Sequence, residues 1–294
     1  MSNRNPDKEA MRSLLILVLT LFIGAACKTK TASVASGSVS ANAPFLWESG
    51  FPKNMYVSQA FSTPDEQAKG TAAKVTASMA TWESSLNNYN FFVEVGTIVE
   101  KTDSITSPNQ LRDSDFAVYK ATAWPYPQYP DALAITQIFA LRQNAGESDE
   151  FLSIREADII MNYEDFFFDE IDTDIYDYDF RTVLVHELGH FLGLQHKPDS
   201  YPRDQTVMYP RIYSQSVETK PDPLLVDRQD LALKYGITLP ATAGGSAITI
   251  APRVYKARPG TTGEMIKIIL ELRANGECVH HADGVEFARH QMRK

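Results

Sequence analysis

The chain has 294 residues, enough for one large domain or two small ones with a sizeable buried core. Hydrophobic residues make up 44% and charged residues 22%, which is typical of a soluble globular protein and not of a disordered or fibrous one. Acidic side chains outnumber basic ones 37 to 28, and the net charge of -9 argues against nucleic acid or an anionic membrane surface as a partner. Two cysteines, Cys27 and Cys278, are too few for a disulfide framework, so the fold has to rest on its core.

The N-terminus has the features of an export signal. Residues 14–26 form an uncharged apolar run of 13 residues, whereas a membrane-spanning helix needs about 20. The run follows Arg12 and ends in small residues directly before Cys27, so we expect residues 1–26 to be a signal peptide, with Met11 as an alternative start. A cysteine at this point resembles the bacterial lipoprotein signal, which implies cleavage before Cys27 and its lipidation. An ordinary signal peptide with an incidental cysteine is the alternative.

This interpretation predicts an exported, membrane-anchored lipoprotein, at the outer membrane or cell surface, with its folded part outside the cytoplasm. Residues 27–45 are mostly Ser, Ala, Thr and Lys, so we expect a flexible tether there. The globular pattern predicts one domain over residues 46–238. Residues 239–294 are expected to form a linker and a small β-rich extension. If Cys27 carries lipid, Cys278 has no partner for an intrachain disulfide.

The body of the chain alternates helix and strand signals. Runs of β-branched and aromatic residues bounded by Pro, Gly and Asn predict strands at 55–58, 91–95, 116–122, 132–141 and 157–163. Capping residues followed by apolar residues three and four apart predict helices at 62–86, 180–192 and 224–236. Near the C-terminus, Asn-Gly and Asp-Gly pairs separate three further strands, a small meander at 265–272, 277–281 and 285–290.

The strongest chemical signal is a group of three histidines on and just after the predicted helix 180–192. His186 and His190 are four residues apart, so they project from one face of the helix and can share a metal ion. Continuing the helix would not bring His196 to the same point. Gly193 can adopt the left-handed conformation that ends a helix and can turn His196 back toward the metal.

This pattern predicts a catalytic zinc site. Three neutral imidazoles leave one tetrahedral position of Zn²⁺ open, whereas structural zinc sites are closed by four protein ligands. Glu187 follows the first histidine, so its carboxylate can reach a water molecule at the metal and act as a general base. The alternative is that these histidines are ordinary core or surface residues of an amphipathic helix.

Residues 186–196, HELGHFLGLQH, resemble the elongated zinc signature of the metzincin peptidases, and the LGLxH ending is most similar to the matrixins. Residues 206–210, TVMYP, resemble the Met-turn of that family. The resemblance implies that His186, His190 and His196 bind zinc, that Glu187 is the base, and that Met208, followed by Tyr209 and Pro210, supports the site. It extends over about residues 46–238. The propeptide cysteine motif of the matrixins is not visible upstream.

The resemblance also implies a fold and a substrate. The expected class is α+β (α/β/α), a mixed twisted sheet with an N-terminal helix, an active-site helix and a C-terminal helix, plus the small C-terminal β-meander. The expected activity is that of a zinc endopeptidase acting on protein or peptide substrates. The substrate would lie along an edge strand, for which 132–141 is the best candidate; an ordinary interior strand is the alternative. The rival functions are a catalytically silent zinc-containing surface binding or adhesion module and a hydrolase of non-peptide amides.

Two further groups of residues invite a metal interpretation. Residues 164–179 contain eight acidic side chains that could hold Ca²⁺, but their spacing matches no standard calcium loop, and a solvated acidic loop is the preferred interpretation. His280, His281 and His290 have no metal-binding spacing, so we expect them to be exposed strand residues.

Overall fold

The computed structural model of the protein describes residues 38–169, 178–198, 201–209, 222–239, 248–275 and 277–290. All of them belong to one compact unit that begins at Ser38. The predicted signal peptide, Cys27, Pro210 and residues 170–177 of the acidic segment lie outside the described residues. None of the described helices is long and apolar enough to span a membrane.

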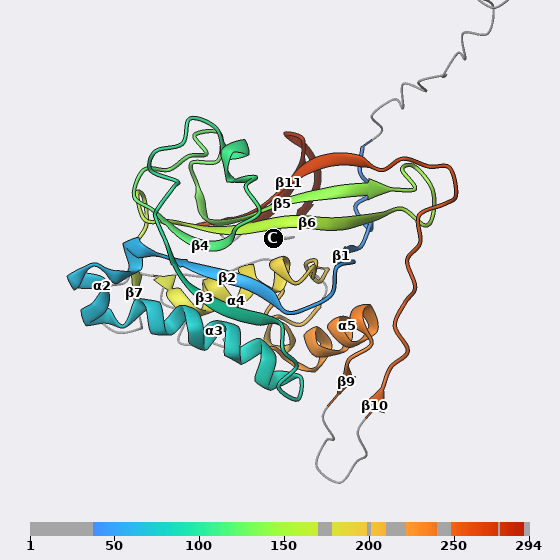
Figure 1. Cartoon of the computed structure of the whole chain (residues 1–294), viewed down its shortest axis with the longest axis horizontal. Helices are drawn as coiled ribbons and strands as arrows, with labels where there is room; N and C mark the ends of the chain where they lie inside the picture. Colours follow the sequence, from blue (N-terminus) through green and yellow to red (C-terminus); the bar gives the residue numbers. More distant parts are fainter. Residues whose placement is uncertain are drawn as a thin grey trace, which may run out of the picture. The chain divides into compact units, whose positions relative to one another are not determined.

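The described part of the chain is built around a nine-stranded mixed sheet (Figure 1). Its strand order is β13-β12-β11-β5-β6-β4-β2-β3, and β1 pairs with β6 beside this path. β5 runs antiparallel to both β6 and β11, whereas β2, β3, β4 and β6 are parallel neighbours. The strands are β1 (Phe45–Trp47), β2 (Lys53–Ser58), β3 (Phe92–Ile98), β4 (Phe116–Ala121), β5 (Ala132–Gln143), β6 (Phe151–Asn162), β11 (Glu264–Arg273), β12 (Cys278–Ala282) and β13 (Val285–His290).

Two short pairs of strands lie outside this sheet. They are β7 (Phe168–Asp169) with β8 (Tyr178–Asp179), and β9 (Thr238–Leu239) with β10 (Ile248–Thr249).

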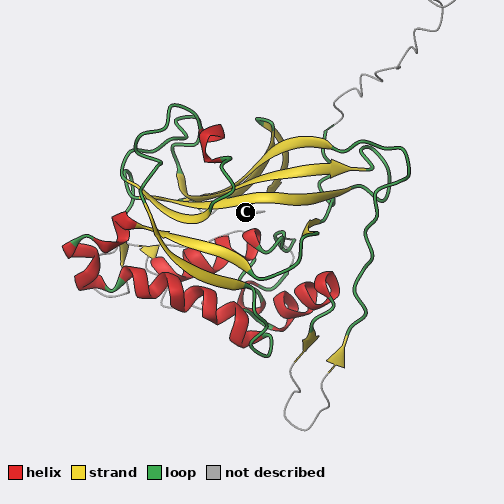
Figure 2. Cartoon of the chain, viewed as in Figure 1, coloured by secondary structure: helices red, strands yellow, loops and turns green. Residues whose placement is uncertain are grey.

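The α-helices lie on one side of the sheet (Figure 2). They are α2 (Pro64–Lys69), α3 (Thr71–Ser85), α4 (Phe180–Phe191) and α5 (Leu225–Tyr235), with short 3₁₀ turns η1 (Gln59–Ser62), η2 (Pro108–Leu111) and η3 (Arg203–Gln205). α4 packs between α3 and the strands β5 and β6. The indole Nε1 of Trp82 on α3 donates to the carbonyl of Val185 on α4 at 3.0 Å. This bond fixes the buried helix α4 against its neighbour.

The sheet has a hydrophobic core on each face. The alternation of side chains along β5 directs Ala134 and Ile138 into the larger core beneath the helices, and Ile135 into a smaller core on the opposite face. Residues of the β3–β4 and β4–β5 connections, including Leu111 and Tyr126, cover this second face. The strands of the sheet are therefore buried on both sides where they pass the predicted zinc motif.

The structure confirms the predicted α+β class and its mixed sheet, with differences in detail. The helix predicted over 62–86 is divided into α2 and α3, because Gly70 adopts a left-handed conformation with φ of +66°. β1 was not predicted. Residues 38–45, expected to belong to the flexible tether, are part of the fold: Val39, Ala43 and Phe45 are buried, and Phe45 pairs with Leu152.

The largest difference concerns the C-terminal meander. Its three strands form as predicted, but β11 pairs with β5 along ten residues and continues the main sheet. The expectation that 132–141 is an exposed edge strand is therefore wrong, and the interior alternative is correct. The expectation of exposed histidines is also wrong for His280 and His281, which are buried. The side chain of His290 lies outside the described residues. Strand pairing of this kind depends on distant partners, which local sequence patterns do not identify.

The integration of β11 predicts the effect of a cavity in it. Leu270 is fully buried and pairs with Thr136 of β5. For Leu270→Ala we expect the free energy of unfolding to fall by about 2–5 kcal/mol, because the removed methyl groups leave a cavity. Urea unfolding followed by circular dichroism measures the change. Met265→Ala, at a partly exposed position of the same strand, is the matched control. A separate early transition would show that the C-terminal strands do not unfold with the main sheet.

Candidate metal centre

Helix α4 and the turn after it position the three predicted histidines. The Asp179 carboxylate accepts from the Thr182 amide at 2.6 Å and caps the first turn. At the other end, Gly193 has φ of +87°, and a side chain there would place its Cβ 2.5 Å from the carbonyl oxygen of Phe45. Glycine is therefore required by both the conformation and the space. The predicted turn exists, and it returns His196 to the face of α4.

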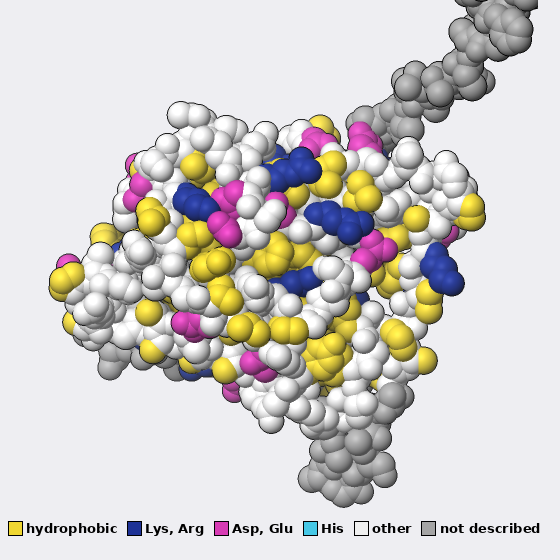
Figure 3. Space-filling model, in the orientation of Figure 1, with side chains coloured by type: hydrophobic (Ala, Val, Ile, Leu, Met, Phe, Trp, Pro, Cys, Tyr) yellow, Lys and Arg dark blue, Asp and Glu magenta, His cyan; other side chains and the backbone are white. Residues whose placement is uncertain are grey.

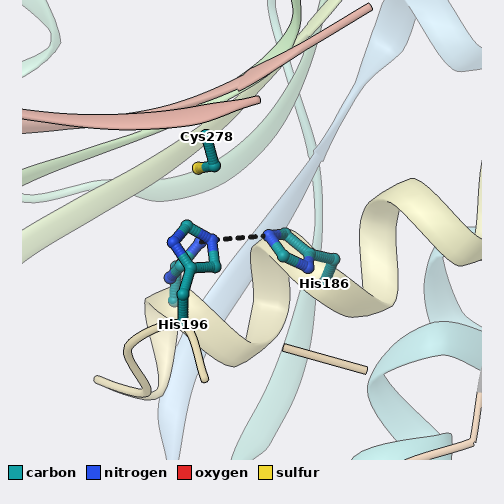
Figure 4. A group of neighbouring side chains, drawn as sticks. His186, His196 and Cys278 are labelled. Carbon is teal, nitrogen blue, oxygen red and sulfur yellow. Dashed lines mark hydrogen bonds between the residues drawn. The ribbon is translucent and has the colours of Figure 1, made fainter. Parts of the chain in front are cut away.

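The imidazoles of His186, His190 and His196 converge on one point. The Nε2 atom of His196 lies 3.1 Å from Nε2 of His186 and 2.9 Å from Nε2 of His190. Figure 4 shows the close approach of His186 and His196, with Cys278 beside them. The exposed fractions of His186, His190 and His196 are 1%, 0% and 8%, so the group is shielded from solvent. None of the described histidines is visible on the face in Figure 3, where acidic and basic side chains are interspersed.

Backbone carbonyls determine the tautomers of two of these histidines. Nδ1 of His186 lies 2.8 Å from the Val207 carbonyl, and Nδ1 of His190 lies 3.0 Å from the Leu194 carbonyl. A carbonyl oxygen can only accept, so both Nδ1 atoms carry the proton and both Nε2 atoms present a lone pair. Burial lowers the pKa of His186 to about 4, which keeps its ring neutral at pH 7. Neutral imidazoles with their lone pairs directed at one point are the form that binds a metal ion.

A fourth donor meets the histidines from the other side. Cys278 is the first residue of β12, and its Sγ and the three histidine nitrogens all lie within 4.8 Å of one another. The thiol is fully buried, and this burial raises its pKa. We refer to His186, His190, His196 and Cys278 as the histidine–cysteine cluster. Sequence analysis did not identify this fourth donor, and the open position predicted from three histidines faces a sulfur atom.

The donor set of the cluster fits zinc. Zinc–nitrogen bonds of about 2.0–2.1 Å place the nitrogens of a tetrahedron about 3.3 Å apart, close to the two separations observed here. Imidazole nitrogen and thiolate sulfur are both ligands that zinc prefers. Nε2 of His196 lies within hydrogen-bond distance of both other nitrogens but can donate a proton to only one of them, whereas a metal ion would accept a lone pair from all three. His186, His190, His196 and Cys278 are the residues that could hold it.

Glu187 lies in the same buried region. Thr136 of β5 donates its hydroxyl to Oε2 of Glu187. The other oxygen, Oε1, is buried and has no hydrogen-bond partner among the described residues. Burial raises the pKa of Glu187 to about 8, against the opposing effect of the Thr136 hydrogen bond, and a cation in the cluster would lower it. With a cation in the cluster Glu187 would therefore be ionised, with one oxygen held by Thr136 and the other able to accept a proton.

The segment with the predicted Met-turn packs against helix α4 and so supports the cluster. Met208 is fully buried, and a Cβ at Gly189 would lie 2.3 Å from its sulfur, so the two residues are in direct contact. Asp227 of α5, also fully buried, accepts from the amide of Val207 at 3.0 Å. Val207 in turn orients His186 through its carbonyl. Tyr209 is partly buried.

Sequence reasoning missed four residues of this site, namely Cys278, His280, Thr136 and Asp227. Cys278 and His280 are two residues apart on a strand, which places them on one face, and Nε2 of His280 lies 2.9 Å from Nδ1 of His196. That spacing was the available signal, but nothing in the sequence shows which way the face points. Asp227 and Thr136 gave no local signal, because their roles depend on contacts with distant elements.

Comparison with known proteins agrees with this geometry. The family model of the matrixin peptidases matches residues 131–231, from the start of β5 into α5. No curated protein matches the chain significantly. Together, the family match and the buried histidine–cysteine cluster support a metallopeptidase. The matched range ends before β11, so the strands that bring Cys278 to the cluster lie outside it.

Gly193 provides a test of how the turn positions His196. In Gly193→Ala the new methyl group would meet the Phe45 carbonyl, so the turn must move. We expect the affinity for zinc to fall at least about tenfold, as for other changes in residues that orient metal ligands. Titration of the metal-free chain with zinc measures it. Gly260→Ala is the matched control, because Gly260 also has a positive φ, of +80°, but has open space around it. Equal affinities for the two variants would contradict this role of the turn.

Proposed function

We propose that the protein is a zinc-dependent endopeptidase in which His186, His190 and His196 hold one zinc ion and Glu187 acts as the general base. The observation that carries the proposal is Oε1 of Glu187, a buried carboxylate oxygen without a hydrogen-bond partner among the described residues. Leaving such an atom unpaired destabilises the fold. A site kept only for metal-dependent folding has no use for it, whereas a hydrolytic site needs a free carboxylate at this position.

Each residue would have a defined role in peptide hydrolysis. A zinc ion bound by the three histidines would polarise the peptide carbonyl and lower the pKa of an attacking water molecule. Glu187 would accept the proton of that water on Oε1 and transfer it to the departing amine. Thr136 holds Oε2 and so keeps the carboxylate in one orientation. Val207 and Leu194 keep the rings of His186 and His190 in the metal-binding tautomer.

A second function has a specific observation in its favour. Cys278 completes a set of four donors, and four protein ligands are typical of structural zinc sites. The protein would then be a zinc-containing surface binding or adhesion module without activity. The unpaired oxygen of Glu187 and the match to a peptidase family favour the endopeptidase.

We also propose that the chain is exported and anchored through lipid at Cys27, which would place the endopeptidase at the outer membrane or cell surface. The support is the sequence alone, namely the apolar run at 14–26 that ends in small residues before the cysteine. Protein or peptide substrates outside the cytoplasm would then be within its reach.

Replacing the general base tests the endopeptidase proposal. For Glu187→Gln we expect kcat/KM toward peptides to fall by about 10²–10⁴-fold, because the amide cannot accept the proton. Zinc content should stay at one ion per chain. The assay is cleavage of a mixed peptide library by the full chain during long incubation, followed by mass spectrometry. Glu147→Gln is the matched control, since Glu147 is exposed, lies in the β5–β6 connection and forms an ion pair with Arg258. If the wild-type chain and the Cys278→Ala variant both bind zinc and neither cleaves any peptide, the binding module is favoured.

The anchor has a matched control within the chain. In cells that make the full chain and are fed a labelled fatty acid, Cys27→Ala should abolish the label and move the protein out of the membrane fraction. Cys278→Ala should retain both the label and the membrane location, because Cys278 is buried in the fold. Label that persists in the Cys27 variant would contradict lipidation at this residue.

A further inference from the structure

The candidate endopeptidase site is closed in this structure. His186, His190 and Glu187 are at most 1% exposed, so a peptide carbonyl has no access to them. At this site the C-terminal strand β12 brings Cys278 to the cluster, and its neighbour β11 pairs with β5, which carries Thr136. Both strands lie outside the range that matches the peptidase family. A segment outside the matched range therefore helps to bury residues that a peptidase must expose.

Strand β12 contacts the cluster with two side chains. Cys278 and His280 point to the same face of the strand, toward α4. The sulfur of Cys278 lies in the cluster, and His280 Nε2 lies 2.9 Å from Nδ1 of His196. If Nδ1 of His196 donates this bond, its Nε2 carries the lone pair and can bind a metal ion, as in the other two histidines. The strand thus supplies a donor atom and also orients one of the three imidazoles.

Strand β11 occupies the edge of β5 next to Glu187. It pairs with β5 from Glu264 opposite Arg142 to Arg273 opposite Ala132. Thr136, which holds Glu187, pairs with Leu270 of β11. An extended peptide that adds to a sheet edge uses the same main-chain groups that β11 uses here. β11 therefore takes the place in which a peptide would have to lie for its carbonyl to come close to Glu187.

We propose that β11 and β12 hold the endopeptidase site in an inactive form, with Cys278 as the fourth metal ligand and β11 in the place of the substrate. This inference rests on the proposed endopeptidase function. Activity would require the two strands to leave together, since one connection joins them and both contact the site. On opening, the Cys278 sulfur leaves the cluster and takes up a proton from solvent. The fourth position and the edge of β5 then become accessible at the same time.

The first test detects the sulfur ligand without using activity. Cobalt replaces zinc in such sites, and a thiolate ligand adds a charge-transfer absorption band in the near ultraviolet. We expect this band in the cobalt-loaded full chain and expect it to be absent in Cys278→Ala, with one cobalt ion still bound by the three histidines. Val279→Ala is the matched control. Val279 is buried on the same strand, where its side chain points to the opposite face, so the variant should keep the band.

The second test measures whether β11 and β12 hold the site in an inactive, closed form, which we call the closure. The cleavage rate follows the fraction of open molecules, so loss of the sulfur ligand should raise the rate of peptide cleavage by the zinc-loaded full chain at least about tenfold in Cys278→Ala. Cys278→Ser keeps the shape of the side chain with a weaker ligand and should also be faster than the wild type. This second variant covers the case in which the alanine chain folds poorly. The double variant Cys278→Ala/Glu187→Gln should lose the gain.

The outcomes separate the closure from the endopeptidase function. A sulfur band together with faster cleavage by the Cys278 variants supports both. Absence of the band from the wild type overturns the closure, and the endopeptidase function stands if the wild type cuts peptides. A band with equal cleavage by wild type and variants also overturns the closure alone. A band with no cleavage by any of the chains overturns both and leaves a structural zinc site.

Discussion

Three imidazole nitrogens that meet at one point in a buried space are the constraint on which this structure depends. A metal ion between them would accept a lone pair from each nitrogen, and several parts of the fold serve to bring the three rings together. The carbonyls of Val207 and Leu194 place the protons on the far nitrogens of His186 and His190. Asp227 holds Val207 in position, and Gly193 allows the turn that returns His196. Changes far from the metal in sequence can therefore affect its binding.

The same cluster can serve two opposite purposes, and the fourth donor decides between them. With Cys278 in place the metal has four protein ligands, an arrangement that stabilises a fold. Without it, one position is open for chemistry, and the carboxylate of Glu187 lies beside it. Because the sulfur is carried by a strand of the main sheet, the choice between these states is coupled to strand pairing. The number of protein ligands at the metal and the pairing of β11 and β12 with the sheet thus change together.

The sequence predicted the parts of the site that lie within one continuous stretch. From residue 186 to residue 196, helical spacing and one glycine are sufficient to bring three histidines together, because each contact depends only on neighbours along the chain. Most of the strands were also predicted, since alternation and turn residues are local features. The pairing of β11 with β5 was not predicted, because about 120 residues separate the strands and many partners would satisfy the same pattern. Cys278 was missed for this reason: its strand was predicted, but not the surface that its strand covers.

The C-terminal strands β11, β12 and β13 also determine which part of the sheet is exposed at its edge. Without them the edge would be β5, a long strand rich in Ala, Ile and Leu whose free main-chain groups could pair with another molecule. With them the edge is β13, which carries Glu286 and Arg289 in a charged pair. Charged side chains on an edge strand disfavour intermolecular pairing. The C-terminal segment thus protects the protein against aggregation. A chain that loses it would expose β5 as an edge strand that can pair with β5 of another molecule.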